Sequence, residues 1–322
     1  MLNTISAWPV MLKLRWSRVD FRALHYFVGI AEIGSITRAA QHLNVAQPAL
    51  SRHVRQLEEE LGAQLFIRES RGIRMTDQGR ELYEHAKSIL RNVQRAKDDV
   101  RGSAGNPGGN TTLGVVPTIC PLIAPKLVSS LQSDYPRINL KIDEGYSQPL
   151  IDWLDAGRLD LALVTEPPPT RRLIIEHLVS EEMVFATARG SRPKGAIPIA
   201  ELARTPLILS HGIRTILDNL LGHKGPLVTA LLELNSIETI RLMVRQGIGT
   251  TVLPRSILHD EAKTGQISLH SIGPSGLFRR LAIAYSRTRR LSNASEIVKG
   301  LLMNIVATQD KQRMFRAPAK IK

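Results

Sequence analysis

A short run of polar side chains between Gln47 and Arg55 carries the clearest chemistry in the sequence. Gln47, Ser51 and Arg55 recur every four residues, Arg52 lies beside them, and Pro48 occupies a first-turn position that tolerates proline. Amide, hydroxyl and guanidinium groups at the exposed start of a helix are the groups that hydrogen-bond to base edges in the DNA major groove. The spacing therefore predicts sequence-specific contacts to double-stranded DNA.

Two short helices joined by a tight turn must position these side chains. The first helix begins after Ser35, whose hydroxyl can cap it, and Asn44 with Val45 forms the turn. The second helix has one continuous apolar face, expected to be buried, which consists of Leu50, Val54, Leu57 and Leu61. This pattern predicts a helix-turn-helix, in which Ser35 and Thr37 are further candidates for DNA contact. An ordinary helical hairpin with a solvated basic face gives the same pattern.

The segment that follows decides between these two interpretations. Residues 66–76, FIRESRGIRMT, are typical of a short strand, a glycine-containing turn and a return strand. The segment carries three cations, Arg68, Arg71 and Arg74. A hairpin of this kind beside a recognition helix places positive charge where DNA phosphates or the minor groove would lie. The sequence therefore predicts a winged helix-turn-helix.

The same stretch resembles the N-terminal domain of the LysR-type transcriptional regulators. The resemblance covers FRALHYFVGIAEIGSITRAAQHLNVAQPALSRHVRQLEEELGAQLFIR, then the wing, then TDQGRELYEHAKSIL. One residue departs from the family pattern, because Ala46 stands where family members usually have a serine that caps the recognition helix. The missing cap forgoes a hydrogen bond worth roughly 1 kcal/mol, so we expect this helix start to fray more.

The charge balance favours anionic partners but does not locate the DNA site. The 322 residues include 43 Lys and Arg against 29 Asp and Glu, for a formal net charge of +14. Both halves of the chain carry an excess of basic residues. No segment has the continuous apolar length of a membrane span, and residues 1–16 lack the uninterrupted apolar core of a signal peptide. We therefore expect a cytoplasmic, nucleoid-associated protein without a membrane partner.

A long helix is expected from Asp77 to about Arg101. Its apolar residues alternate at spacings of four and three, which is typical of a coiled-coil seam, and they are Leu82, Ala86, Ile89, Val93, Ala96 and Val100. The surrounding face is charged, so this apolar stripe needs a partner helix. Packing on the helix's own domain is the alternative. The family resemblance favours a dimerisation helix.

Beyond a glycine-rich linker, GSAGNPGGN, strands and helices alternate. Strands are expected at 112–116, 138–143 and 159–164, and helices at 120–135 and 148–156. This order suggests βαβ units on a largely parallel sheet. A crossing segment at 183–188 leads to a second lobe, and 281–285 returns to the first. The resemblance implies a two-lobed α/β effector domain like that of periplasmic binding proteins.

The expected architecture is a multidomain α+β protein with six segments. They are an extension at 1–18, either mis-assigned or disordered, a winged helix-turn-helix at 19–76, a dimerisation helix at 77–101, a flexible linker at 102–110, an effector domain at 111–308 and a basic tail at 309–322. Within the effector domain we expect lobe 1 at about 111–186 and 281–308, and lobe 2 at about 187–280.

Helix N-termini at the carboxyl ends of strands predict where a ligand would bind. At such places free N–H groups and the helix dipole favour an anionic ligand. Three junctions match, at 116–118, 146–147 and 235–236. In the family pattern Thr118 and Ser236 face each other across the cleft, with Ser210 on the second lobe, and Ser147 is a further candidate. Each of these hydroxyls can also be a helix cap with no ligand.

Other chemistry is not indicated by the sequence. Cys120 is the only cysteine, so no internal disulfide is possible, and its apolar neighbours favour a small buried hydrophobe over a thiol sensor. The histidines show no metal-ligand spacing with Asp or Glu. Neither a glycine-rich phosphate loop nor a Ser-His-Asp grouping occurs. We therefore expect no catalytic site, no metal and no cofactor.

Two functions from different classes fit these features. The first is a LysR-type regulator that binds inverted-repeat promoter sites as a homodimer or a dimer of dimers, responds to a small-molecule effector and, if it is an activator, contacts RNA polymerase. The second is a solute-binding or enzymatic domain of the same two-lobed fold, in which the N-terminal winged helix-turn-helix (the head) is incidental. The complete head and the absence of an export signal favour the first. GYSQPLIDWLDAGRLDLALVTEPP further resembles the branch related to nitrogen-assimilation regulators.

Overall fold

The structure is a computed structural model that describes residues 20–69, 72–102, 107–168, 170–190, 195–222, 228–311 and Phe315. The expected extension at 1–18, Arg71, the middle of the linker and most of the basic tail lie outside these residues. The chain divides into two compact units, Met1–Gln94 and Arg95–Lys322, and the boundary between them falls inside the long helix.

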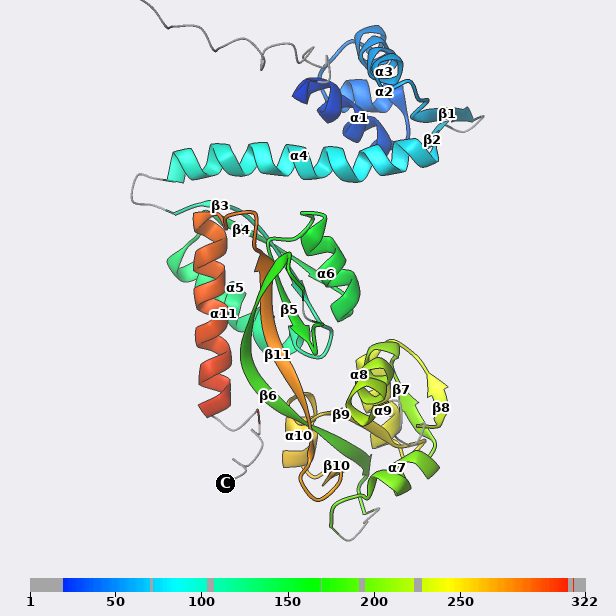
Figure 1. Cartoon of the computed structure of the whole chain (residues 1–322), viewed down its shortest axis with the longest axis vertical. Coiled ribbons are helices and arrows are strands. Elements are labelled where there is room, and N and C mark those ends of the chain that lie inside the picture. The colour runs from blue at the N-terminus through cyan, green and yellow to red at the C-terminus, as the bar shows by residue number, and fades with distance from the viewer. Residues whose placement is uncertain are drawn as a thin grey trace, which may run out of the picture. The chain divides into compact units, whose positions relative to one another are not determined.

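Three helices form the core of the first unit, namely α1 Phe21–Ile33, α2 Ile36–His42 and α3 Gln47–Leu61 (Figure 1). Asp20 caps α1, because its carboxylate accepts the N–H of Ala23 at 2.6 Å. Asn44 takes the left-handed conformation in the turn before α3, with φ of 54°. Apolar side chains from all three helices fill the space between them, among them Phe27, Ile30, Ala39, Leu50 and Val54.

The buried face of α3 is shorter than the sequence predicts. Leu50, Val54 and Leu57 are buried, but Leu61 is 43% exposed. Leu61 is the last residue of the helix, and the left-handed Gly62 directly after it turns the chain away. Leu61 therefore lies beyond the core that the other three side chains contact.

A two-stranded hairpin follows, in which β1 Phe66–Glu69 pairs antiparallel with β2 Gly72–Met75. This is the predicted wing. Glu58 of α3 fixes its start, because the Glu58 carboxylate accepts the backbone N–H groups of Leu65 at 2.8 Å and Phe66 at 3.2 Å. The wing is thus tied to the helix that the sequence assigns to base contacts.

The long helix α4 runs over Asp77–Gly102, close to the predicted span. Thr76 caps it, since its Oγ1 accepts the N–H of Gly79 at 2.9 Å. Gly79 is needed there because a β-carbon at this position would lie 2.2 Å from the carbonyl oxygen of Leu65. The first turn of α4 therefore passes directly against the backbone that leads into the wing.

Lobe 1 of the second unit is a sheet covered by helices on both faces. Its strands are β3 Gly109–Val115, β4 Ile138–Glu144 and β5 Leu161–Thr165, and its helices are α5 Cys120–Asp134, α6 Ser147–Asp155 and α11 Asn293–Lys311. β3 pairs in parallel with both β4 and β5. In Figure 1, α5 and α11 lie on one side of the sheet and α6 on the other. The core includes Leu113, Ile123, Leu150, Leu163 and Leu302.

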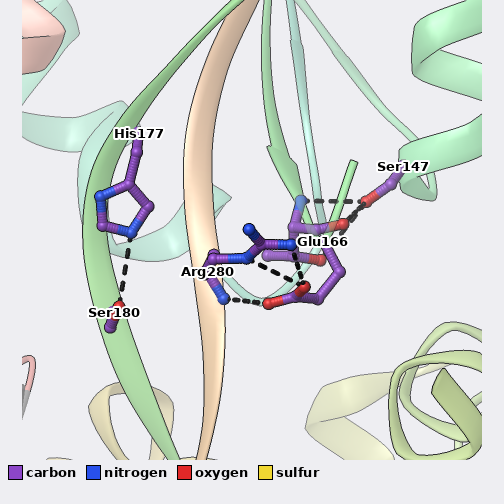
Figure 2. Close-up of polar contacts among 6 residues, drawn as sticks. Ser147, Glu166, His177, Ser180 and Arg280 are labelled. Atoms are coloured by element: carbon purple, nitrogen blue, oxygen red, sulfur yellow. Dashed lines mark hydrogen bonds and ion pairs between the residues drawn. The ribbon is translucent and has the colours of Figure 1, made fainter. Parts of the chain in front are cut away.

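Two long strands connect the lobes, and they pair with each other antiparallel. They are β6 Leu173–Ala188 and β11 Leu277–Ser286. Val179 of β6 packs in the core of lobe 1 and Met183 in the core of lobe 2. Near the irregular pairing at Leu281, the Oγ of Ser180 lies 3.4 Å from the Nε2 of His177 (Figure 2).

Lobe 2 has its own core and is built from shorter elements. They are α7 Ile199–Arg204, β7 Leu207–Leu209, α8 His211–Leu221, β8 Ala230–Glu233, α9 Ile237–Arg245, β9 Thr251–Pro254, the 3-10 helix η1 Arg255–Leu258, α10 His259–Lys263 and β10 Ile267–Ser271. β7 and β8 pair in parallel, whereas β9 and β10 pair antiparallel with β6. The buried side chains include Ile208, Leu217, Ile240 and Leu253.

The main sheet is mixed, which corrects the expectation of a largely parallel one. Its strand order is β10-β6-β11-β5-β3-β4, with β9 also on β6. The parallel pairs are those of lobe 1, where strands and helices alternate, and the returning strand β11 runs antiparallel to β5. A helical crossover favours parallel pairing, but β6 and β11 cross between lobes without one.

Two expected boundaries also shift. β3 begins at Gly109, inside the expected linker, and α11 continues to Lys311, inside the expected tail. Gln309 is buried against α5, and its Nε2 donates to the carbonyl oxygen of Leu122 at 2.7 Å. Over the residues described above, no helix combines the length and apolarity needed to cross a membrane.

Candidate functional site

The predicted recognition residues lie on the first turns of α3, opposite its buried face. Gln47, Pro48, Arg52 and Arg55 are exposed, and Ser51 is half-buried with its Oγ 3.4 Å from the Nε2 of Gln47. As expected from the sequence, Ala46 precedes the helix without a side-chain cap. The polar start of α3 is therefore free to contact a groove.

The candidates on α2 differ from each other in role. Ser35 caps the helix, because its Oγ accepts the N–H of Arg38 at 3.4 Å, whereas Thr37 is exposed. Arg38 is itself an exposed cation on this helix, and its Nη2 donates to the carbonyl oxygen of Ile33 at 3.1 Å. Arg38 was not predicted from the sequence, although its position one residue after Thr37 could have suggested it.

The wing presents less unpaired charge than its arginine content suggests. Arg68 is exposed on β1. Arg74 of β2 forms an ion pair with Glu69, with 2.7 Å between Nε and Oε1, so the strand partner partly neutralises it. Arg71 lies outside the described residues. Arg68 is therefore the wing cation with the clearest access to a phosphate.

The structure divides the predicted seam of α4 into two parts. Ala86 is fully buried and Leu82 half-buried in a cluster with Leu24 and Phe27 of α1, so these two pack inside their own domain. This corrects the expectation that the whole seam faces a partner. Further along the helix, Ile89 is 40% exposed, Val93 is half-buried and Ala96 is exposed. The side chain of Val100 lies outside the described residues.

A cavity of about 410 Å³ lies between the two lobes of the second unit. Lobe 1 contributes the segment just before α5, the start of α6 and the end of β5, and lobe 2 contributes the starts of α8 and α9. Apolar atoms supply most of the surface of the cavity, and its polar residues include Thr118, Gln148, Thr165, Thr215, Asn219 and Asn235. A cavity of this size suits a small organic molecule.

Two of the predicted ligand hydroxyls belong to lobe 1, and both line the cavity. Thr118 is 4% exposed, and its hydroxyl makes no hydrogen bond to any residue that the structure describes. Ser147 is already bonded, because its Oγ donates to the carbonyl oxygen of Thr165 at 2.8 Å and accepts the Thr165 N–H at 3.0 Å (Figure 2). Thr118 is thus available to a ligand, whereas Ser147 ties α6 to β5.

The two predicted hydroxyls of lobe 2 are helix caps. Ser210 lines the cavity, but its Oγ accepts the N–H of Ile213 at 3.3 Å and caps α8. Ser236 is exposed outside the cavity lining and caps α9 by accepting the N–H of Thr239 at 3.2 Å. This placement corrects the expectation that Ser236 faces Thr118 across the cleft. Its neighbours Asn235 and Ile237 line the cavity instead.

A buried ion pair at the cavity was not predicted from the sequence. Arg279 of β11 lines it, and the Nε and Nη2 of Arg279 donate to the Oε2 of Glu181 at 2.9 and 2.6 Å. Ser256 of η1 donates to the other carboxylate oxygen. Arg279 and Glu181 are register partners on the two crossing strands and are 1% and 0% exposed. The paired carboxylate offsets the charge that Arg279 brings to the cavity.

A second carboxylate in the lining is also paired. Glu166 follows β5 in a left-handed conformation, with φ of 46°. Its Oε2 accepts from the Nε and Nη2 of Arg280 at 3.2 and 3.0 Å, and its Oε1 accepts the Arg280 backbone N–H (Figure 2). No short-range pattern in the sequence links residues 166 and 280, since the pairing arises only when β5 lies beside β11.

Cys120 lies near the cavity but not in its lining. The thiol is buried, and burial first, then a hydrogen bond to Glu144, raises its pKa to about 12. A thiol that keeps its proton at neutral pH is a poor nucleophile. The structure therefore supports the interpretation of Cys120 as a small apolar side chain.

Two family models match the chain. The model for the bacterial regulatory helix-turn-helix protein of the lysR family matches residues 21–80, and the model for the LysR substrate binding domain matches residues 104–304. The first covers α1 to the start of α4, and the second covers both lobes. The two matched ranges include α3, the wing and the residues that line the cavity.

Curated and solved relatives agree with these matches. The chain is 30% identical to the nitrogen assimilation regulatory protein nac of Escherichia coli strain K12 over 294 residues, which is 90% of this chain and 96% of that protein. It resembles full-length OxyR from Pseudomonas aeruginosa with a TM-score of 0.69 at 26% identity, covering 94% and 98% of the two chains. It shares the fold of full-length CbnR in complex with its target DNA, with a TM-score of 0.66 at 20% identity over 90% and 99%.

Proposed function

Because the chain belongs to the LysR family of bacterial transcriptional regulators, we propose that α3 and the wing bind specific promoter sites and that a small molecule in the cavity alters its action there. Family membership makes the chain a regulator with a helix-turn-helix DNA-binding domain and an effector-binding domain. One observation carries the proposal: the same chain holds a free polar face on α3 and a cavity lined from both lobes, with an unpartnered hydroxyl at Thr118.

The DNA contacts divide into two kinds. Gln47, Ser51, Arg52 and Arg55 read base edges, with Pro48 at the helix start, and the wing cations with Ser35 and Thr37 hold the phosphates on either side. Two features support this assignment. The polar side chains lie on the exposed face of α3, and Glu58 fixes the wing to the same helix.

The protein acts as a homodimer or a dimer of dimers on inverted-repeat sites. The exposed part of the α4 seam, from Ile89 to Ala96, supports this, because an isolated helix would leave that stripe in water. Two heads related by a twofold axis read two half-sites of opposite orientation. On this proposal the protein acts in the cytoplasm, on the nucleoid, and RNA polymerase is a further partner if the protein is an activator.

The effector is a small, partly apolar molecule with one hydrogen-bonding or anionic end. The apolar lining supports the first part of this description. Thr118 and the starts of α5 and α6, which have no side-chain caps, support the second, because free N–H groups and the helix dipole favour an anion. Arg279 contributes less than a bare guanidinium would, since Glu181 neutralises it.

Thermal unfolding with a panel of small organic acids tests the cavity. We expect at least one acid to raise the melting temperature of the wild type, because a ligand that binds only the folded state stabilises it. Thr118→Val should lose this shift, and Ser236→Ala is the matched control that should keep it, since Ser236 lies outside the lining. An acid that stabilises wild type and Thr118→Val equally would place the ligand elsewhere.

A further inference from the structure

Gly212 is the second residue of α8, directly after His211. Its φ is not positive, so backbone conformation does not require glycine at this position. Close approach does require it. A β-carbon on residue 212 would lie 2.5 Å from the Cδ1 and 2.7 Å from the Cε1 of Tyr146. The missing side chain of Gly212 therefore makes room for the Tyr146 ring.

This contact connects the two lobes. Tyr146 lies between β4 and α6 in lobe 1, whereas Gly212 belongs to α8 in lobe 2. The ring also meets His211 edge-on, with 5.7 Å between the ring centroids and 62° between the planes. All three residues line the cavity. One aromatic side chain thus spans from the wall of lobe 1 to the first turn of a lobe 2 helix.

Both sides of the contact are held in place by hydrogen bonds. In lobe 1, Ser147 next to the ring is bonded twice to Thr165 at the end of β5. In lobe 2, Ser210 caps α8, and the Oδ1 of Asn235 accepts the N–H of His211 at 3.4 Å. Because each support is fixed to its own lobe, the ring leaves Gly212 when the lobes move apart.

We propose that Tyr146 and Gly212 form a clasp that holds the two lobes together across the cavity. The clasp adds a means of regulation to the ligand site, and this regulatory part of the inference rests on the proposed function. Release of the ring from Gly212 opens the cavity, and binding of an effector is coupled to this step. Contact with His211 adds an aromatic pair that favours the closed arrangement.

A disulfide trap tests the clasp without ligand or DNA. The β-carbons of Tyr146→Cys and Gly212→Cys would lie within about 5 Å of each other, near the separation that a disulfide needs. We expect mild oxidation of the full-length double variant to link them, leaving Cys120 as the one alkylatable thiol after unfolding. The control pair is Tyr146→Cys with Ser236→Cys, which places the second thiol in lobe 2 outside the cavity lining.

The proposal is overturned if the 146–212 pair stays reduced, or if the control pair oxidises equally fast.

A second readout uses Gly212→Ala, whose methyl group would occupy the space that the Tyr146 ring fills. Hydrogen exchange at residues 146–150 and 210–216 should rise by about threefold or more. Gly300→Ala in α11, where a β-carbon meets open space, should change nothing. Unchanged exchange in Gly212→Ala would also refute the clasp. The organic-acid panel remains a separate test, so failure here does not decide whether the cavity binds a ligand.

Discussion

At the scale of single residues, Glu181 and Arg279 form a buried pair whose disruption should be costly. Glu181→Gln removes the negative charge while keeping the shape of the side chain, and Arg279 then remains as a buried cation without a counter-charge. We expect the free energy of unfolding of the effector domain to fall by about 3–5 kcal/mol. Urea denaturation followed by circular dichroism measures it.

Arg280→Ala is the matched control for this pair. It breaks the ion pair with Glu166, but the Arg280 side chain is 64% exposed, so solvent already screens the interaction. The expected loss is about 1 kcal/mol or less. Equal destabilisation by the two variants would mean that burial does not set the strength of these pairs.

The Cys120 thiol should be unreactive in the folded protein. Burial raises its pKa from 9.0 to about 12, so the thiolate fraction at pH 8 is about 10⁻⁴. We expect no detectable reaction with a disulfide reagent under native conditions and one thiol per chain after unfolding. Because the folded state holds this proton more tightly, stability should also fall as the pH rises above about 9. Rapid native labelling would contradict the assignment.

The sequence identified residues on continuous elements better than residues brought together by folding. The α3 side chains follow one helical period, so their shared exposed face could be predicted. Glu181 and Arg279 are far apart in sequence, and they become neighbours only when β6 pairs with β11. Ser236 was misplaced because a hydroxyl before a helix serves equally as a cap or as a ligand group.

At the scale of elements, α4 has two functions along one apolar stripe, and two variants should separate them. Ile89→Asp places a carboxylate on the exposed part of the seam, so we expect a folded monomer with strongly reduced operator affinity. Ala86→Asp places the same group in the core beneath α1, so the DNA-binding domain should unfold. Sedimentation velocity and circular dichroism distinguish the two results.

The outcome for Ile89→Asp decides whether α4 is a dimerisation helix. A variant that sediments as the wild-type oligomer would show that the protein assembles through another surface. Ala86→Asp supplies the internal comparison, because both variants add one carboxylate to the same helix and differ in burial. The whole stripe looked alike in sequence, since spacing alone does not reveal which half the helix's own domain covers.

Some of the other helices and strands could be predicted from the local sequence pattern, and others could not. The helices of the head and the strand–helix alternation of lobe 1 could be predicted from periodicity and caps. The part of β6 before residue 183 was missed, because it carries Glu176, His177, Glu181 and Glu182 among its apolar residues. The three glutamates find their partners on β11, α11, η1 and β10, so only the folded lobes make this segment a strand.

At the scale of the whole molecule, regulation by an effector requires that a ligand bound in the second unit changes how the first unit acts on DNA. A ligand shifts an assembly only by its differential affinity for two states. Strands β6 and β11 join the lobes continuously, and Tyr146 links them again at the cavity. In the proposed function, lobe closure is the two-state element through which a ligand would act.

The most direct test of the central claim is selection of genomic DNA fragments by the purified full-length protein, followed by sequencing. Wild type should enrich a small set of promoter fragments that share an inverted repeat. Arg52→Ala should reduce that enrichment about 5- to 150-fold, because one base contact discriminates by about 1–3 kcal/mol, while binding to bulk DNA stays similar. A wild type that enriches no fragments, or an Arg52→Ala variant that enriches the same fragments equally, would contradict the account.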